Sequence, residues 1–313
     1  MWSVRHSSIL FSRSGCGKDA CRFGHASQVP FMSISPNSQR NLDPETVAGF
    51  GEEWSHFDQT QLPDSERERL FNAYFSIFPW DSLGADASGF DLGCGSGRWA
   101  KLMSARVGHL HCIDASDQAL EVARRNLAGV TNCSLWHASV DEIPLEDGSQ
   151  DFGYSLGVLH HIPDTARAMA QCVAKLKPGA PFLVYLYYSF ENRPAWFRKI
   201  WRATDRVRQV ICVQPEPLKR RITDAIAVTV YWPTARLAAA LENVGLDVDV
   251  MPLSQYRRSS FYTMRTDARD RFGTRLEQRF SRTEIQQMME SAGLTRITFS
   301  DESPYWCAVG YRL

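Results

Sequence analysis

The sequence predicts an α/β fold in which a mostly parallel β-sheet carries helices on both faces. Apolar runs of strand length alternate with helix-like segments from residue 84 to residue 187, which is the pattern of a parallel sheet. A glycine-rich turn over residues 93–97 follows the first run, at the edge where such sheets bind ligands. Near the C-terminus, two alternating segments separated by Ser303 and Pro304 predict a closing strand pair.

Local signals justify each element in turn. The strands are apolar runs bounded by turn residues, and the helices between them have helical periodicity with suitable caps. Ser116 and Asp164 are well placed as N-caps, and Ser281 with Glu284 forms a capping box for a helix that Gly293 ends. The expected strands are 88–92, 109–113, 133–137, 152–156, 181–187, 294–299 and 305–312, and the expected helices are 98–105, 117–127, 165–176 and 282–292.

The chain of 313 residues divides into regions by composition and periodicity. Residues 1–44 are rich in Ser, Arg and Gly without periodicity, which predicts a flexible leader. Its first part lacks acids, as transit peptides do, but we favour a true start at Met32 over a targeting segment. An aromatic, helical cap is expected over 45–83. The main domain is expected over 84–313, with an insertion at 188–280.

Composition narrows the class of protein. A hydrophobic content of 44% is ordinary for a globular chain, and a net charge of zero gives no argument for a nucleic-acid partner. No apolar run approaches the roughly 20 residues that span a membrane. Eight cysteines without a repeating spacing are typical of reduced thiols, and Cys16, Cys21 and His25 lack a fourth metal ligand. We therefore expect a cytoplasmic protein with no metal, no nucleic-acid partner and no stable membrane insertion.

An acid and three alternating glycines form the most informative motif: Asp91, Gly93, Gly95 and Gly97. Glycines at such a turn let the backbone approach a ligand closely and adopt dihedrals that side chains disfavour. Asp114 ends the next apolar run, where an acid is placed to accept hydrogen bonds from both hydroxyls of a ribose. The motif therefore predicts a ligand that contains a nucleoside.

The spacing disfavours a dinucleotide, whose G-x-G-x-x-G loop has glycine where this chain has Arg98. A carboxylate before the loop would also repel a pyrophosphate and attract an ammonium group. With its acid followed by G-x-G-x-G, the chain resembles the class I S-adenosylmethionine-dependent methyltransferases, in particular small-molecule enzymes of the methyltransferase type 11 group. The resemblance covers residues 85–187 and 281–313. It implies a Rossmann-like seven-stranded sheet with an antiparallel final strand, and S-adenosyl-L-methionine as cofactor.

The resemblance also implies a cofactor site. Amides of residues 93–97 and of the helix N-terminus that follows would bind the carboxylate of S-adenosylmethionine. Asp91 would contact its ammonium group, directly or through water, and Asp114 would contact its ribose. Ser139 stands where the family commonly has an acid that binds adenine, and its hydroxyl can make that contact beside the Val140 amide, whereas Asp141 can simply be solvated. The residues expected to bind cofactor are Asp91, Gly93, Cys94, Gly95, Gly97, Asp114, Ala115, Ser139, Val140 and Leu156.

His160 and His161 follow the fourth expected strand, at the ligand-binding edge of the sheet. The pair resembles that of small-molecule methyltransferases, including sugar O-methyltransferases. A histidine can take the proton of a hydroxyl that attacks the methyl group, because its pKa lies near neutrality. In the alternative, one imidazole only orients the loop, since methyl transfer from a sulfonium often requires mainly positioning. Either histidine is a candidate base.

The insertion carries an excess of cations, with 17 Lys and Arg against 10 Asp and Glu over residues 190–280. Residues 196–208 mix apolar and basic side chains, which predicts an amphipathic lid helix with a solvated basic face. A site for an anionic substrate and a contact with a membrane surface are the alternatives. Some sugar methyltransferases that the chain resembles carry an acid at the end of the fifth strand, whereas here no carboxylate precedes Glu191. Acid-assisted or metal-assisted methylation is therefore disfavoured, and Tyr185 and Tyr187 are expected near the pocket instead.

These features predict transfer of a methyl group from S-adenosylmethionine to a small molecule, at a hydroxyl of a sugar-like or secondary-metabolite substrate. Methylation at carbon of a quinone-like or other activated ring is the alternative, because the motif at residues 157–164 resembles that group too. A cofactor-binding subunit without catalytic activity is a further alternative, which would tolerate loss of both histidines.

Overall fold

The computed structural model describes residues 40–313. Most of the expected leader lies outside the described residues, together with Met32, Cys16, Cys21 and His25. The first described helix begins at Pro44, where Asp43 caps it by accepting hydrogen bonds from the next backbone amides.

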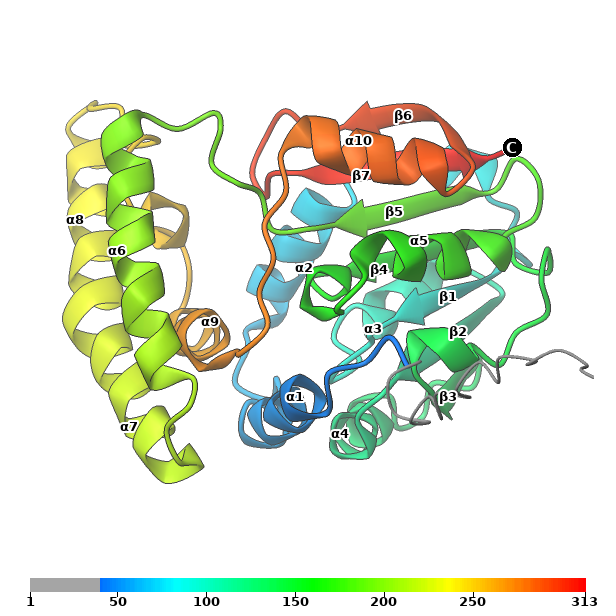
Figure 1. Ribbon diagram of the computed structural model, residues 1–313, viewed down its shortest axis with the longest axis horizontal. Helices are drawn as coiled ribbons and strands as arrows, with labels where there is room; N and C mark the ends of the chain where they lie inside the picture. The colour runs from blue at the N-terminus through cyan, green and yellow to red at the C-terminus, as the bar shows by residue number, and fades with distance from the viewer. Residues whose placement is uncertain (1–39) are drawn as a thin grey trace, which may run out of the picture. The chain divides into compact units, whose positions relative to one another are not determined.

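A seven-stranded mixed sheet forms the centre of the described chain (Figure 1). Its strand order is β3-β2-β1-β4-β5-β7-β6, so the order reverses beside β1. The final strand, β7, runs antiparallel to both β5 and β6, whereas the first five strands are parallel. This arrangement confirms the expected fold class. The strands are β1 Ser88–Leu92, β2 His109–Asp114, β3 Cys133–His137, β4 Phe152–Leu156, β5 Pro181–Tyr185, β6 Leu294–Phe299 and β7 Cys307–Arg312.

Both faces of the sheet are buried by helices, because successive side chains of a strand point to opposite faces. On β5, Phe182 and Val184 pack in one apolar cluster with Met169 of α5 and Met289 of α10. Leu183 between them belongs to a second cluster, which includes residues of the N-terminal segment and of α3 and α4. The flanking helices are α3 Ala100–Met103, α4 Asp117–Asn126, α5 Thr165–Ala174 and α10 Arg282–Ser291.

The capping predictions are confirmed. Ser116 accepts a hydrogen bond from the Ala119 amide at the start of α4, and Asp164 caps α5 in the same way. Ser281 and Glu284 form the reciprocal capping box of α10. These helices therefore begin where their sequence signals place them.

Two helices precede the sheet: α1 Pro44–His56 and α2 Asp64–Tyr74, followed by the short turn η2 Trp80–Ser82. Phe71 and Phe75 stack with ring centroids 4.3 Å apart and are buried. Helix α1 packs against α4 and also against α9 of the insertion, Phe261–Gly273. The N-terminal segment thus bridges the sheet domain and the insertion.

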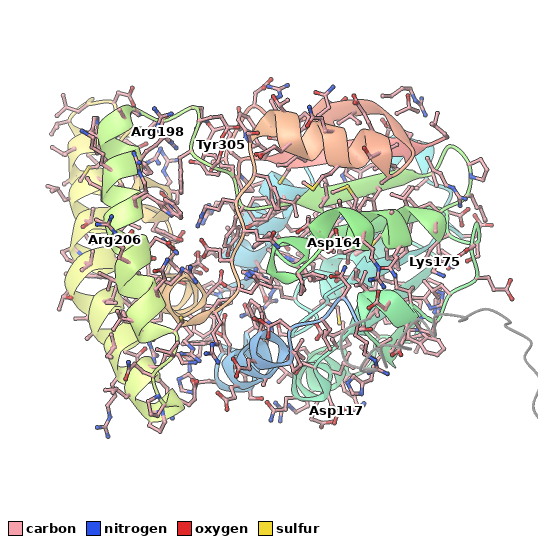
Figure 2. All side chains as sticks on the ribbon, in the orientation of Figure 1. Asp117, Asp164, Lys175, Arg198, Arg206 and Tyr305 are labelled. Atoms are coloured by element: carbon pink, nitrogen blue, oxygen red, sulfur yellow. The ribbon has the colours of Figure 1, made fainter. Side chains whose placement is uncertain are left out.

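The insertion forms a helical bundle beside the carboxyl ends of the parallel strands (Figure 1). Ala227, Ala235, Met264 and Ala268 lie in its apolar core. On α6, Arg198 and Arg206 are exposed (Figure 2), whereas Arg208 is buried. The apolar Trp196 and Val207 of the same helix are also exposed, so the expected division into a packed apolar face and a solvated basic face is incomplete. The bundle comprises α6 Ala195–Ile211, α7 Glu216–Ile226, the π-helical turn η6 Ala227–Tyr231, α8 Trp232–Asn243, the turn η7 Ser254–Tyr256 and α9 Phe261–Gly273.

Some element lengths differ from the expectation. The helix after the glycine loop is α3, only Ala100–Met103, continued by a 3₁₀ turn at Ser104–Arg106 (η3). Strand β5 ends at Tyr185 because the chain beyond it leaves β7 and approaches the segment before α10, where Tyr188 bridges to Phe280. Among the helices of residues 40–313, none combines the length and apolarity needed to cross a membrane.

Candidate functional site

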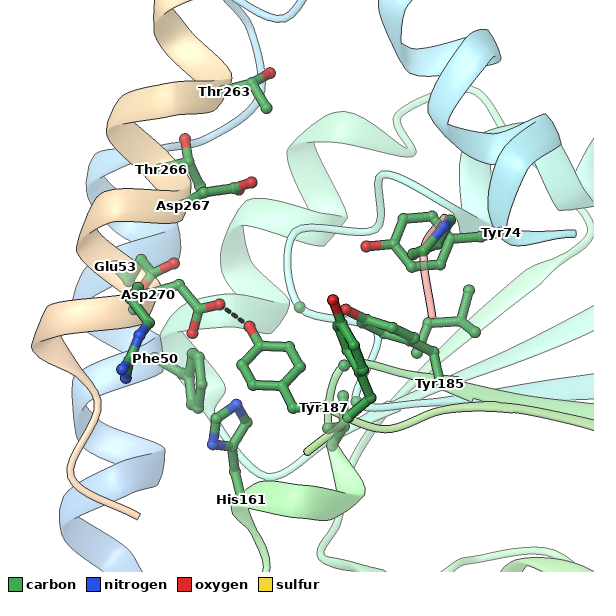
Figure 3. Close-up of a pocket in the computed structure, with 18 of the residues that line it drawn as sticks. Phe50, Glu53, Tyr74, His161, Tyr185, Tyr187, Thr263, Thr266, Asp267 and Asp270 are labelled. Atoms are coloured by element: carbon green, nitrogen blue, oxygen red, sulfur yellow. Dashed lines mark hydrogen bonds between the residues drawn. The ribbon is translucent and has the colours of Figure 1, made fainter. Parts of the chain in front are cut away.

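A cavity of about 1100 Å³ opens at the carboxyl ends of β1, β2, β4 and β5. Its walls also include residues of α1, α2, α6 and α9, so sheet and insertion enclose it together (Figure 3). Ligand pockets commonly measure about 300–1,000 Å³, and this cavity therefore has room for two small molecules side by side. The position beside β1, where the strand order reverses, is where open α/β sheets bind ligands.

The glycine loop forms one wall of the cavity through Gly93, Cys94 and Gly95. Gly93 and Gly95 have φ of +77° and +53°, which side-chain-bearing residues rarely adopt. A Cβ at Gly95 would lie 2.8 Å from the indole nitrogen of Trp54 on α1. The loop therefore needs glycine both for its conformation and for the close approach of α1.

Asp114, at the end of β2, lies in the cavity wall beside the loop. Its Oδ2 accepts a hydrogen bond from the Gly95 amide and its Oδ1 from the Ser116 amide, each at 2.8 Å. Burial raises the pKa of this carboxyl, and the two amide hydrogen bonds oppose the rise. Each carboxylate oxygen keeps a second lone pair, so the group can accept the two hydroxyls of a ribose diol.

The other residues expected around the nucleoside also line the cavity, which supports the fit of S-adenosylmethionine to this wall. The hydroxyl of Ser139 is buried and has no hydrogen-bond partner among the described residues. Such an unsatisfied group is costly unless a ligand or water satisfies it, and an adenine amine would do so. Cys94, Ala115, Val140 and Leu156 complete this wall.

Asp91 does not reach the cavity. It is 1% exposed, and its Oδ2 accepts a hydrogen bond of 3.0 Å from the Tyr154 hydroxyl in the core. Burial is the largest cause that raises its pKa to about 8; the Tyr154 hydrogen bond opposes the rise, and nearby Asp114 adds to it. The expected direct contact of Asp91 with an ammonium group is therefore not what the geometry provides, because this face of β1 points into the core.

The loop amides are also largely occupied. The Gly93 and Cys94 amides donate to the Ile113 carbonyl, and the Gly97 amide donates to Cys94. Gly97 does not line the cavity; a Cβ there would meet Ala123 of α4 at 3.3 Å, so this glycine serves close packing. Most of the backbone amides of residues 93–97 are therefore not free to donate hydrogen bonds to a ligand carboxylate, contrary to the expectation. Asp141, expected to be solvated, instead forms an ion pair of 2.7 Å with Arg167.

The structure distinguishes the two histidines. His160 is fully buried, stacks on Tyr187 with centroids 3.9 Å apart and does not line the cavity. His161 lines the cavity, and its Nδ1 lies 2.6 Å from the Leu276 carbonyl oxygen. Because a carbonyl only accepts, Nδ1 carries the hydrogen, which leaves Nε2 as an acceptor without a partner among residues 40–313. Burial lowers the pKa of His161, so its ring is neutral at neutral pH.

Three carboxyl groups in the cavity were not anticipated from the sequence: Glu53 of α1 and Asp267 and Asp270 of α9. Tyr187, just after β5, donates a hydrogen bond from its hydroxyl to Asp270 (Figure 3). The sequence signal for the α9 pair is their spacing of three residues, which places them on one helix face. No acid follows β5 before Glu191, whereas α1 and the insertion supply these three acids to the cavity.

Burial dominates the electrostatics of Glu53 and Asp267. Burial raises the pKa of Glu53 well above its ordinary value, and the nearby charge of Asp270 adds to the effect. Burial also raises the pKa of Asp267 to about 6, against a hydrogen bond with Tyr256 that lowers it. The acids thus lie close together in a poorly hydrated wall.

The chain is similar to known methyltransferases over its sheet domain. Residues 90–184 match the family model described as a methyltransferase domain. Ubiquinone biosynthesis O-methyltransferase of Aromatoleum aromaticum is 32% identical over 158 residues, or 49% of this chain and 64% of that protein. Demethylmenaquinone methyltransferase of Staphylococcus aureus is 36% identical over 93 residues, or 28% of this chain and 38% of that protein. The solved YcgJ protein of Bacillus subtilis is 16% identical, with a TM-score of 0.45, over 73% of this chain and 70% of that chain.

The chain spans less than two thirds of the length of these curated relatives. The family match ends at residue 184, before the insertion begins. The match covers the residues that form β1 to β5. This part of the chain supplies Asp114, Ser139 and His161 to the cavity wall.

Proposed function

Since residues 90–184 are a class I S-adenosylmethionine-dependent methyltransferase domain, we propose that the whole chain methylates a hydroxyl group of a small molecule. The observation that carries the proposal is the position of His161. Its unpartnered Nε2 belongs to the same cavity as Asp114 and the glycine loop. Because the cavity has room for a second ligand beside the cofactor, Nε2 of His161 can accept a proton from a hydroxyl group of that ligand.

The proposed roles follow from the walls of the cavity. Asp114 binds the ribose diol, and the Ser139 hydroxyl binds the adenine amine. Bound S-adenosylmethionine supplies an electrophilic methyl group on its sulfonium. Nε2 of His161 would accept the proton of the acceptor's hydroxyl group as that oxygen takes the methyl group.

The surrounding residues fix the tautomer and the orientation of the His161 ring. The Leu276 carbonyl holds its tautomer, because Nδ1–H donates to it. Phe50 of α1 packs against the imidazole with ring centroids 4.9 Å apart. A neutral, oriented imidazole in a cavity walled by aromatic rings suits proton transfer from a hydroxyl, and this favours methylation at oxygen over methylation at carbon.

Related properties belong to the same proposal. The acceptor is a small molecule rather than a nucleic acid, since the cavity is enclosed by α1 and the insertion. A cytoplasmic location is supported by the cysteines of the described chain, which are unpaired: Cys94, Cys112, Cys133, Cys172, Cys212 and Cys307.

The test combines binding with transfer. Calorimetry should show binding of S-adenosylhomocysteine to the purified chain, and labelled methyl should move from S-adenosylmethionine to members of a panel of phenols and sugars. Absence of binding would overturn the proposal. Binding with full transfer after His161→Ala would keep the cofactor assignment and reject the base.

A further inference from the structure

We propose that the methyl acceptor carries a protonated amine, bound by the carboxyl groups of Glu53, Asp267 and Asp270 and by the aromatic rings beside them. The inference rests on the proposed methyl transfer, because it names the chemical class of the acceptor in the same cavity. Its observations come from α1 and α9, which lie outside the segment that matches the methyltransferase family.

The three carboxyl groups converge on one wall of the cavity. Helices α1 and α9 pack together, and Figure 3 shows Glu53 beside Asp270, with Asp267 one turn further along α9. Glu53 is only 4% exposed. Among residues 40–313, none of the three forms an ion pair within 4 Å, although Asp270 accepts hydrogen bonds from Tyr187 and Thr274. This wall therefore brings together three carboxyl groups that can carry negative charge.

The nearby arginines are mostly neutralised by other acids. Arg269 pairs with Glu216 at 2.5 Å and does not line the cavity, although its charge lowers the pKa of Glu53. Arg271 pairs with Asp205 and Glu277. These pairs hold both guanidinium groups on other acids, although Glu277 is shared with Arg279.

Arg98 lines the cavity and forms no ion pair within 4 Å among the described residues. Its guanidinium lies over the Trp99 ring at 4.2 Å and over the Trp54 ring at 5.6 Å. Arg98 lowers the pKa of Glu53 and of Asp267, but burial outweighs it in both cases. Neither Arg98 nor Arg269 forms an ion pair with the three carboxyl groups, so an ammonium group of a ligand would give them the close positive partner that residues 40–313 do not provide.

Aromatic rings surround the same wall. Tyr74 and Tyr185 meet with centroids 5.1 Å apart, and Tyr185 and Tyr187 with centroids 5.9 Å apart; all three line the cavity. Ring faces attract ammonium groups within about 6 Å, most strongly where water is excluded. Carboxyl groups flanked by tyrosine rings therefore match an organic ammonium better than a neutral ligand.

An independent observation comes from His161, which points toward Phe50 and Tyr187 in the same region of the cavity (Figure 3). The His161 side chain is 5% exposed, and its Nε2 has no partner among the described residues. Nε2 is therefore free to accept a hydrogen bond from a ligand. Tyr187 links this region to Asp270 through its hydroxyl. One molecule with a hydroxyl at His161 and an amine at the acids would satisfy both ends.

Matched probes test the charge preference. Tyramine, 4-ethylphenol and 3-(4-hydroxyphenyl)propionate share a phenol and differ in charge, while D-glucosamine and D-glucose form a second pair. Calorimetry is run with and without S-adenosylhomocysteine. At least one cation should bind tenfold or more tightly than its neutral partner, with the propionate weakest. If neither cation exceeds its neutral partner, or if the propionate binds most tightly, the inference is wrong.

Variants assign the effect to the wall. Glu53→Gln and Asp267→Asn should each weaken binding of the preferred cation about tenfold and leave its neutral partner within twofold. Glu52→Gln is the matched control, because Glu52 is the exposed neighbour on α1. Circular dichroism and thermal unfolding check that each variant is folded.

Binding of S-adenosylhomocysteine separates the two proposals. If it binds the wild-type chain and both acid variants alike, loss of cation preference reports on the acceptor alone. If its affinity falls with that of the amine in the variants, the acids serve the cofactor and the acceptor assignment is overturned. If it does not bind the wild-type chain, the proposed function itself fails.

Discussion

The hydroxyl of Tyr187 donates a hydrogen bond to the carboxylate of Asp270, and so joins the end of the central sheet to helix α9 of the insertion. Tyr187 also stacks on His160. The contact therefore connects the wall that carries His161 with the wall that carries the acids.

Replacement of Tyr187 by phenylalanine should weaken this connection while it preserves the stacking ring. A hydrogen bond to a charged group contributes about 1.5–3 kcal/mol, so we expect Y187F to lose free energy of unfolding in that range, measured by urea denaturation. Tyr311→Phe serves as the control, since the Tyr311 hydroxyl makes no hydrogen bond with the described residues. Equal stability of the two variants would show that the Tyr187 contact is not formed in solution.

Asp114→Ala should weaken binding of S-adenosylhomocysteine about thirtyfold or more. The change removes the acceptor for the ribose diol and leaves the Gly95 and Ser116 amides without their partner. Calorimetry measures the loss, with Asp117→Ala as the control on the neighbouring helix. Unchanged affinity in the Asp114 variant would mean that the nucleoside lies elsewhere.

His161→Ala should lower kcat by a factor of about 100 or more, as expected for loss of a general base. His160→Phe, which retains a ring against Tyr187, should stay within about fivefold of the wild type. The readout is formation of S-adenosylhomocysteine with the best acceptor of the panel. The reverse ranking of the two variants would transfer the base role to His160.

The pH profile of the wild-type enzyme follows from the pKa of His161. The base acts in its neutral form, and burial lowers its pKa below the ordinary value of 6.5. Activity should therefore be constant through neutral pH and fall only on the acid side, below pH 6.5, as the ring becomes protonated. An acid limb above pH 7 in kcat would contradict this assignment.

Asp91 should make stability depend on pH in an unusual direction. Its folded pKa of about 8 is above the ordinary value of 3.8, so between these limits the folded state binds more protons than the unfolded state. The contribution of Asp91 to the free energy of unfolding is complete at low pH. It decreases as pH rises, by up to about 1.4 kcal/mol per pH unit. The ligand-free Asp91→Asn variant should show a flatter profile between pH 5 and 8 than the wild type, measured by urea denaturation. Parallel profiles would show that the pKa is not raised.

Much of the sheet was predictable because its signals are local. Apolar runs, turn residues and caps such as Ser116 and Asp164 act over a few neighbours, and each strand occurs close to its expected range. The end of β5 was less predictable: Tyr187 continues the apolar run, yet contacts with distant residues draw the chain away from β7.

The candidate site was predictable where sequence neighbours and sheet register define it. Asp114 and the glycine loop meet because β1 and β2 are adjacent parallel strands. Asp91 shows the limit of the motif, since alternation along β1 turns its side chain toward Tyr154. Asp267 and Asp270 approach Glu53 only through packing of α9 on α1, more than 200 residues away in sequence, and no local pattern indicates that contact.

The separation of Asp114 on β2 from Asp267 and Asp270 on α9 has a consequence for engineering. The insertion is a continuous stretch whose ends both return to the sheet domain near Tyr188 and Phe280, so it can be exchanged as one cassette. A chimera that carries a different cassette on the same sheet should keep its affinity for the cofactor while its choice among candidate acceptors changes. Libraries aimed at new acceptors would therefore gain most from diversity in α9 and the facing turn of α1.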